Sequence, residues 1–193
     1  TVGLEAEEEC GTIFLRLRKG FLAGSVKVSV VSAYETLGST KMGARVIAAR
    51  PGTEGAVLDA LATGDETFDG LAAGGVILVG ERAADSAGTL SAALRLAEKT
   101  GARIAWVPRR AGDRGALEAG AFPHLLPSGR PVGVADARVD AAAVWGVDSL
   151  PEVPGKNTDQ ILAAVAAGEL GGLLLGGVSL DDLPAGAKEA LEA

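Results

Sequence analysis

Cysteine and histidine are nearly absent from this chain of 193 residues, which contains one of each. The single cysteine, Cys10, excludes an internal disulfide bond and any metal site that needs four thiolates from this sequence. We interpret it as a free thiol, because no histidine stands near it to activate it. The single histidine, His124, has no GxSxG serine to serve, so we interpret it as a turn residue. A GxGxxG motif is also missing, which argues against a nicotinamide-binding site.

The chain also lacks a basic excess, long apolar runs and large aromatic content. Its 25 acidic and 18 basic residues give a net charge of −7, whereas a nucleic-acid partner requires a basic face. No apolar run approaches the length that a membrane-spanning helix needs, so we expect no direct membrane insertion. Hydrophobic residues make up 48% of the chain but aromatic residues only 4%, so small aliphatic side chains must build the core.

Short apolar runs alternate with helical patterns along the sequence. They predict strands at 26–31, 44–49, 75–80, 102–107 and 172–177. Helical spacing predicts helices at 12–22, from Thr53, up to Lys99 and Gly101, over 114–120, from Asn157, and as a last piece after Pro184. Strands that alternate with helices indicate an α/β fold with a mostly parallel sheet and helices on both faces.

Capping residues place two of these helices more closely. Thr53 is a natural N-cap for a helix that carries Val57, Leu58 and Leu61. Either Ser86 or Thr89 can cap the helix whose apolar stripe is predicted to be Leu90, Ala93, Leu94 and Ala97.

The domain organisation predicted from these patterns has two parts. Residues 1–11 are acidic and aperiodic and are predicted to form a linker or frayed start. Residues 12–193 are predicted to form one α/β domain, a fragment of a longer chain. Within it, five prolines between 121 and 156 indicate an extended segment with one short helix at 140–145, which wraps the domain or contacts a neighbour.

Arginines and glycines follow several predicted strands. Because the carboxyl ends of parallel strands meet at one sheet edge, we expect a locally positive edge there, formed by Arg50, Arg82, Arg109, Arg110 and the Gly176-Gly177 turn. These arginines could be solvated, could pair with acidic neighbours or another domain, or could hold an anion or nucleotide. The last alternative would use Arg109, Arg110 or Arg114 with the backbone N–H groups of 113–115.

Other polar and aromatic residues suggest no further site. The acidic groups at 65–69 and at Asp181-Asp182 are predicted to lie on loops, without enough converging ligands for a metal. Trp106 and Trp145 are interpreted as core or interface residues.

Three ordered groups of motifs resemble a known superfamily. They are FLRLRK, VKVSVVSA and RPGTEGAVLDAL within 14–61, then GVILVG with GARIAWVPRRAGDRGALEAG, and finally the stretch 154–184. In that order they resemble the molybdopterin oxidoreductases. More narrowly, they resemble the C-terminal part of the large iron–sulfur subunits of bacterial NADH-quinone oxidoreductases, known as the G subunits, in their actinobacterial form. The resemblance implies a three-layer, Rossmann-like, formate dehydrogenase/DMSO reductase-like domain.

The resemblance also indicates where relatives hold a pterin-guanine dinucleotide. The corresponding positions in this chain form a vestigial pterin or anion edge made of Pro51, Gly52, Thr53, Arg109, Arg110, Arg114, Gly115, Gly176 and Gly177. Two departures speak against a bound cofactor. Val178-Ser179 replaces the Asn-Pro pair of metal-binding relatives, and Asp113 stands where relatives often have Asn and would repel phosphate.

The resemblance therefore implies a structural, non-catalytic, cofactor-less domain in the peripheral arm of an NADH-quinone oxidoreductase. The parent chain would carry [2Fe–2S] and [4Fe–4S] clusters in other, cysteine-rich domains. The implied partners are those domains and neighbouring peripheral-arm subunits, on the cytoplasmic side of the membrane. Two alternatives stay open: an active pterin-binding fragment of a molybdenum oxidoreductase, and an independent Rossmann-like nucleotide-binding module.

Overall fold

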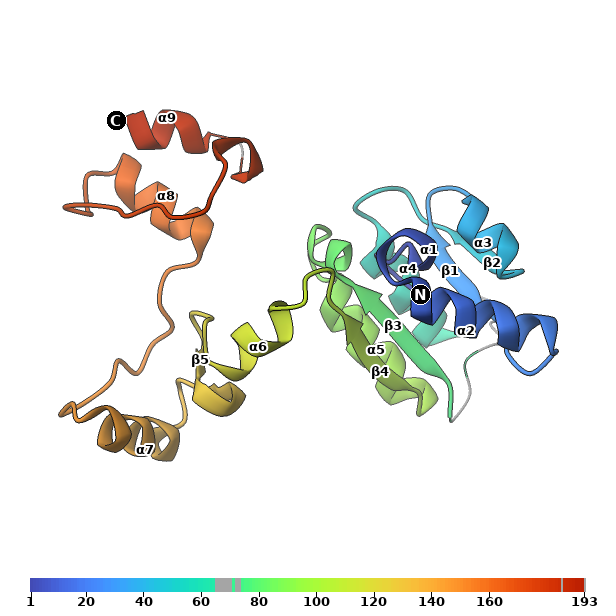
Figure 1. Cartoon of the computed structure of the whole chain (residues 1–193), viewed down its shortest axis with the longest axis horizontal. Helices are drawn as coiled ribbons and strands as arrows, with labels where there is room; N and C mark the ends of the chain where they lie inside the picture. Colours follow the sequence, from blue (N-terminus) through green and yellow to red (C-terminus); the bar gives the residue numbers. More distant parts are fainter. Residues whose placement is uncertain (65–70, 72–73, 185, 193) are drawn as a thin grey trace. The chain divides into compact units, whose positions relative to one another are not determined.

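The computed structural model describes residues 1–64, 71, 74–184 and 186–192. By its contacts the chain divides into two compact units, Thr1–Ala111 and Gly112–Ala193 (Figure 1). The sequence instead predicts one domain over 12–193. That prediction concerns how the units pack and stays a prediction, so each unit is described by itself.

The first unit is built on parallel strand pairs. Its strands are β1 (Ser29–Ser32), β2 (Arg45–Ala48), β3 (Val76–Gly80) and β4 (Arg103–Val107). β1 pairs with β2 and β3 pairs with β4, both in parallel, with Val31 opposite Ile47 and Val79 opposite Trp106. The predicted strands near 26–31, 44–49, 75–80 and 102–107 and their parallel pairing are therefore confirmed.

The first residues of the chain lie between the two strand pairs. Val2 forms a parallel bridge to Val31 in β1 and another to Val79 in β3. Its N–H donates to the Leu78 carbonyl at 3.0 Å, and its carbonyl accepts from the Gly80 N–H at 2.9 Å. Val2 is only 1% exposed. The predicted acidic linker at 1–11 is thus wrong for its first residues, because these backbone groups complete the sheet.

Helices cover both faces of this parallel arrangement. On one face, α4 (Glu54–Thr63) and α5 (Thr89–Thr100) contribute to a core that includes strand residues Ile47 and Ile77. On the other, α1 (Ala6–Glu9) and α2 (Gly11–Leu22) contribute to a core that includes Val30 and Val107. The short helices α3 (Leu37–Lys41) and η1 (Glu81–Ala84) follow β1 and β3. The α/β class and the helix predicted at 12–22 are confirmed.

The start and the buried face of α5 differ from the prediction. Its N-cap is Gly88, at φ 82°, instead of Ser86 or Thr89. Ala93 and Ala97 are buried as predicted, but Leu90 and Leu94 are exposed. The other buried residues of the helix are Thr89, Ala92 and Leu96. Small residues form the contact because they allow α5 to approach α4 and β3 closely. The prediction instead placed the more hydrophobic leucines on the buried face. Gly101 ends the helix as predicted, at φ 70°.

The second unit contains short elements joined by extended segments. Its elements are α6 (Asp113–Glu118), β5 (Leu125–Leu126), η2 (Pro127–Gly129), β6 (Arg130–Pro131), α7 (Ala135–Trp145), α8 (Thr158–Ala166), η3 (Leu180–Asp182) and α9 (Ala187–Glu192). β5 and β6 pair antiparallel. The predicted helix over 114–120 is present as α6, and the one at 140–145 begins earlier, at Ala135.

The predicted fifth strand is absent from its place. Residues 172–177 do not pair with any strand in the described part of the chain, and the Leu174 side chain is 95% exposed. An all-apolar run forms a buried strand only if a neighbouring strand pairs with it, and in the described part of the second unit β5 and β6 pair with each other instead. Trp106 and Trp145 are also exposed, so neither is a core residue.

One stability prediction concerns α8. Asn157 accepts a hydrogen bond from the Gln160 N–H at 3.0 Å, and Gln160 accepts one from the Asn157 N–H at 2.9 Å. Asn157→Ala removes one half of this capping box and is expected to cost about 1 kcal/mol of helix stability. Amide hydrogen exchange in α8 checks this, with Asp148→Ala as a control outside any helix. Equal exchange rates in wild type and Asn157→Ala would contradict it.

Candidate functional site

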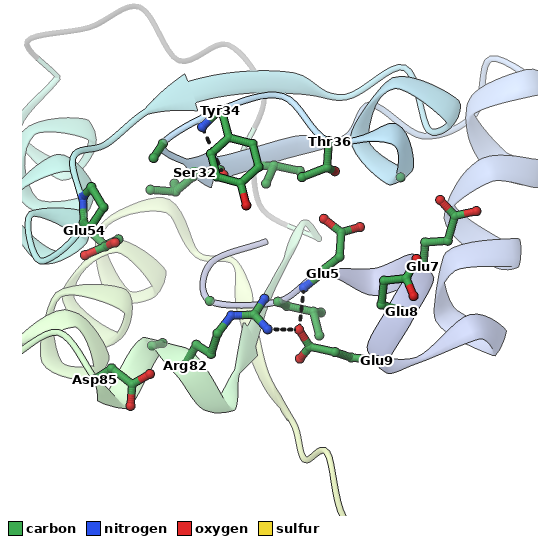
Figure 2. A pocket seen from close by; sticks show the side chains of 18 of the residues that line it. Glu5, Glu7, Glu8, Glu9, Ser32, Tyr34, Thr36, Glu54, Arg82 and Asp85 are labelled. Atoms are coloured by element: carbon green, nitrogen blue, oxygen red, sulfur yellow. Dashed lines mark hydrogen bonds and ion pairs between the residues drawn. The ribbon is translucent and has the colours of Figure 1, made fainter. Parts of the chain in front are cut away.

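A cavity of about 1110 Å³ lies where the strands of the first unit end (Figure 2). Ser32 ends β1, Pro51 and Gly52 follow β2, Arg82 follows β3, and Arg109 follows β4. The segment 3–9 contributes a further wall. The prediction that these loops gather along one carboxyl edge of a parallel sheet is confirmed for the first unit.

The cavity is acidic. Its lining contains three basic side chains, Lys41, Arg82 and Arg109, and six acidic ones, Glu5, Glu7, Glu8, Glu9, Glu54 and Asp85. Figure 2 shows Glu5, Glu7 and Glu8 on one side and Glu54 and Asp85 across from them. The prediction of a locally positive edge is therefore wrong. The segment predicted to be a linker brings four of the six carboxylates.

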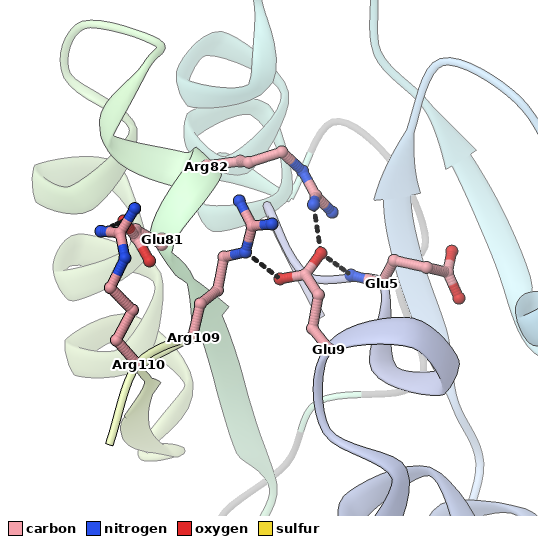
Figure 3. A network of polar contacts seen from close by, with 6 residues as sticks. All are labelled: Glu5, Glu9, Glu81, Arg82, Arg109 and Arg110. Atoms are coloured by element: carbon pink, nitrogen blue, oxygen red, sulfur yellow. Dashed lines mark hydrogen bonds and ion pairs between the residues drawn. The ribbon is translucent and has the colours of Figure 1, made fainter. Parts of the chain in front are cut away.

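Glu9 engages two of the arginines (Figure 3). Its side chain is only 6% exposed and pairs with the Arg82 guanidinium. The same carboxyl oxygen accepts a hydrogen bond from the Glu5 N–H at 3.1 Å, and the other oxygen lies 4.0 Å from Arg109 Nε. Outside this network, Arg110 pairs with Glu81 at 3.3 Å. Pairing with acidic neighbours is thus the alternative that the structure shows for these arginines.

Three buried oxygen atoms of cavity-lining residues have no hydrogen-bond partner within the described part of the chain. They are Ser86 Oγ, Glu54 Oε2 and Glu9 Oε2. The Glu9 atom still has the Arg109 charge nearby, whereas the Ser86 hydroxyl sits in a residue that is 7% exposed. Buried polar groups normally have a hydrogen-bond partner. These oxygen atoms could therefore accept hydrogen bonds from a group that binds in the cavity.

The predicted site residues are only partly brought together. Pro51, Gly52 and Arg109 line the cavity. Thr53 is the N-cap residue of α4, as predicted, but its hydroxyl donates to the Arg50 carbonyl at 2.8 Å and makes no cap bond. The remaining members of the set lie outside the cavity lining: Arg110, Arg114, Gly115, Gly176 and Gly177.

The residues of the second unit are placed separately. Arg114 pairs with Glu118 at 2.9 Å on α6, which also contains Gly115, and Gly176 and Gly177 follow the unpaired leucine run. The vestigial anion edge as a whole therefore stays a prediction. Sequence reasoning missed Glu5 and Glu9. The strand-like alternation of Val2, Leu4 and Ala6 was the signal that could have placed them.

The remaining candidates have structural surroundings. The His124 carbonyl accepts from the Val132 N–H at 2.8 Å next to the β5–β6 turn. Cys10 is the N-cap residue of α2 and is partly buried. Asp181 and Asp182 lie in η3, while the acidic group at 65–69 lies outside the described residues. Across the described chain, no helix is long and apolar enough to cross a bilayer.

The pterin cofactor of the molybdopterin oxidoreductases and the iron–sulfur clusters expected in the parent chain do not fit this cavity. A pterin-guanine dinucleotide carries a pyrophosphate, which six carboxylates would repel while the lining cations are already engaged by Glu7 and Glu9. An iron–sulfur cluster needs several thiolates, and the chain has one. Among described residues, no three His, Cys, Asp or Glu side chains converge to hold a metal ion.

Comparisons with known proteins show close relatives. No family model matches the sequence. The chain is 48% identical over 191 residues to the G subunit of the NADH-quinone oxidoreductase of Streptomyces coelicolor, covering 95% of this chain and 23% of that protein. It is 52% identical over 182 residues to the protein of the same name from Mycobacterium bovis, covering 94% of this chain and 22% of that one. The chain thus spans less than a quarter of the length of these relatives.

Proposed function

We propose that this chain, which is homologous to a segment of the NADH-quinone oxidoreductase G subunit, is a structural and cofactor-less domain of that protein. The observation that carries the proposal is an identity near one half over almost the whole chain. The resemblance of the ordered motifs favours the C-terminal region and a molybdopterin-oxidoreductase-like, Rossmann-like origin. The parallel strands covered by helices on both faces support that origin.

The charge of the cavity supports the absence of a dinucleotide. In a phosphate site, arginines and backbone N–H groups face the ligand. Here the cavity arginines turn to Glu9, and further carboxylates stand around them. The active pterin-binding fragment and the nucleotide-binding module both require the opposite charge, so neither is favoured by the structure.

In this proposal the domain packs on other domains of the same large iron–sulfur protein and on neighbouring peripheral-arm subunits, on the cytoplasmic side of the membrane. The whole assembly passes electrons from NADH to quinone. Other domains of the parent would hold the [2Fe–2S] and [4Fe–4S] clusters, because one cysteine cannot. The chain itself would hold no redox centre.

Metal and pterin analysis of the purified chain tests the proposal. We expect molybdenum and iron well below one atom per chain and no pterin fluorescence after oxidative extraction. A known molybdenum enzyme extracted in parallel controls the recovery. Near-stoichiometric metal or pterin would contradict the proposal and favour the active fragment.

A thermal-shift screen with guanine and adenine nucleotides tests the remaining alternative. We expect no nucleotide to raise the melting temperature of the chain, since the cavity repels phosphate. A rise that Arg109→Ala abolishes would favour the nucleotide-binding module. Arg16→Ala, at an exposed arginine of α2 outside the cavity lining and outside the predicted anion site, is the matched control.

A further inference from the structure

The cavity presents hydrogen-bond acceptors and charge that the described part of the chain leaves unsatisfied. Ser86 is more than nine-tenths buried, lines the cavity, and its hydroxyl has no partner among the described residues; Glu54 Oε2 is likewise a buried atom without a partner there. Leaving such a group without a partner costs about 1–3 kcal/mol. Two such atoms at one cavity therefore point to a donor that arrives from outside.

The unpaired carboxylates of the cavity indicate that this hydrogen-bond donor is positively charged. Lys41 is engaged by Glu7, and both cavity arginines are engaged by Glu9. Within the described ranges, no cation pairs with the other four lining acids, Glu5, Glu8, Glu54 and Asp85. Carboxylates that share a cavity repel one another. A cationic group with several N–H donors would relieve the repulsion and satisfy the buried oxygens.

The rim of the cavity indicates that the cation belongs to a polypeptide. Tyr34 and Leu37 both line the cavity and are 70% and 77% exposed. Tyrosine is enriched at protein interfaces and among the residues that dominate their binding energy, and the exposed leucine beside it adds apolar contact area.

We propose that the cavity receives an arginine-bearing segment of a neighbouring polypeptide. The guanidinium enters between the Glu5 wall and the Glu54 wall, where its five N–H donors match several acceptors at once. The apolar residues beside that arginine pack on Tyr34 and Leu37. The inference goes beyond the proposed function, because a structural domain needs no such pocket, and metal analysis tests that function separately.

Titration calorimetry of the 193-residue chain with two peptides tests the inference. The probe is acetyl-Leu-Arg-Gly-Leu-Arg-amide, and its control replaces both arginines by citrulline, which keeps shape and loses charge. We expect the arginine peptide to bind at least about tenfold more tightly, and its affinity to fall as salt rises. Equal affinity for the two peptides would overturn the inference. Spermine binding as tightly as the arginine peptide would overturn its polypeptide part.

Two variants locate the binding. Glu5→Gln combined with Glu54→Gln should weaken the arginine peptide about tenfold, whereas Glu98→Gln with Asp136→Asn, an equal charge change at residues that do not line the cavity, should not. Tyr34→Ala changes an exposed side chain and should weaken binding several-fold at an unchanged melting temperature. The inference would be overturned if the double variant in the cavity and the control double variant weakened peptide binding equally. It would also be overturned if the double variant in the cavity and Tyr34→Ala both bound the arginine peptide with wild-type affinity.

Discussion

Deletion of residues 1–3 is expected to unfold the first unit under conditions in which the intact chain is folded. The deletion removes four backbone hydrogen bonds: Thr1 to Ser29, Val31 to Thr1, Val2 to Leu78, and Gly80 to Val2. At about 1 kcal/mol each, with roughly 2 kcal/mol for the buried Val2 side chain, the loss is about 6 kcal/mol. That is comparable to the whole stability of many domains.

Circular dichroism during urea unfolding measures this effect. Val2→Asp keeps the chain length and should also destabilise strongly, because it places a carboxylate between β1 and β3. Glu8→Ser, an exposed change in the same segment, is the control and should shift the midpoint little. A deletion variant with the midpoint of the intact chain would show that these residues are dispensable, as the linker prediction implied.

The second large effect is expected from Gly80→Ala. A Cβ at this position would lie 2.1 Å from the Gly3 carbonyl oxygen and 2.9 Å from Leu4 Cα. The obstacle is backbone, which cannot rotate away as a side chain would. The variant must displace the segment 1–4 from the sheet, and we expect a loss of about 3 kcal/mol or more.

Gly11→Ala is the matched control for Gly80→Ala. No other part of the described chain lies within 4 Å of a Cβ at Gly11, which begins α2, so the same methyl group should be neutral or slightly stabilising. Thermal unfolding of both variants compares them directly. A Gly80→Ala chain as stable as wild type would contradict the close packing of residues 1–4 against β3.

The parallel strands of the first unit could be predicted because each is a short apolar run between turn residues. The run GVILVG became β3 with its ends nearly as expected, and Thr53 stands at the start of α4. Residues 1–4 could not be placed this way. Three successive glutamates dominate the acidic stretch 1–11, while its strand pairing depends on a single residue, Val2, whose bridge partners Val31 and Val79 lie far along the chain.

The leucine run at 172–177 shows the reverse error. Its composition is that of a buried strand, yet strand formation depends on a neighbour that local sequence cannot supply. The location of the candidate site could be predicted from the strand ends, but its charge could not. The sign depends on Glu5, Glu7, Glu8 and Glu9 arriving from a segment that periodicity left unassigned.

The position of Val2 has a consequence for synthesis on the ribosome. Its bridge partner Val79 lies later in the chain by about 80 residues, which take roughly 4–16 s to translate. Throughout that interval the apolar residues around Val2 have no β3 to pair with, and β1 alone can hold one of their edges. The two halves of the first unit therefore cannot close one after the other as the chain emerges. They can come together only after β3 has been synthesised, with residues 1–4 between them. Until then these residues lack their β3 partner, and a chaperone could bind them.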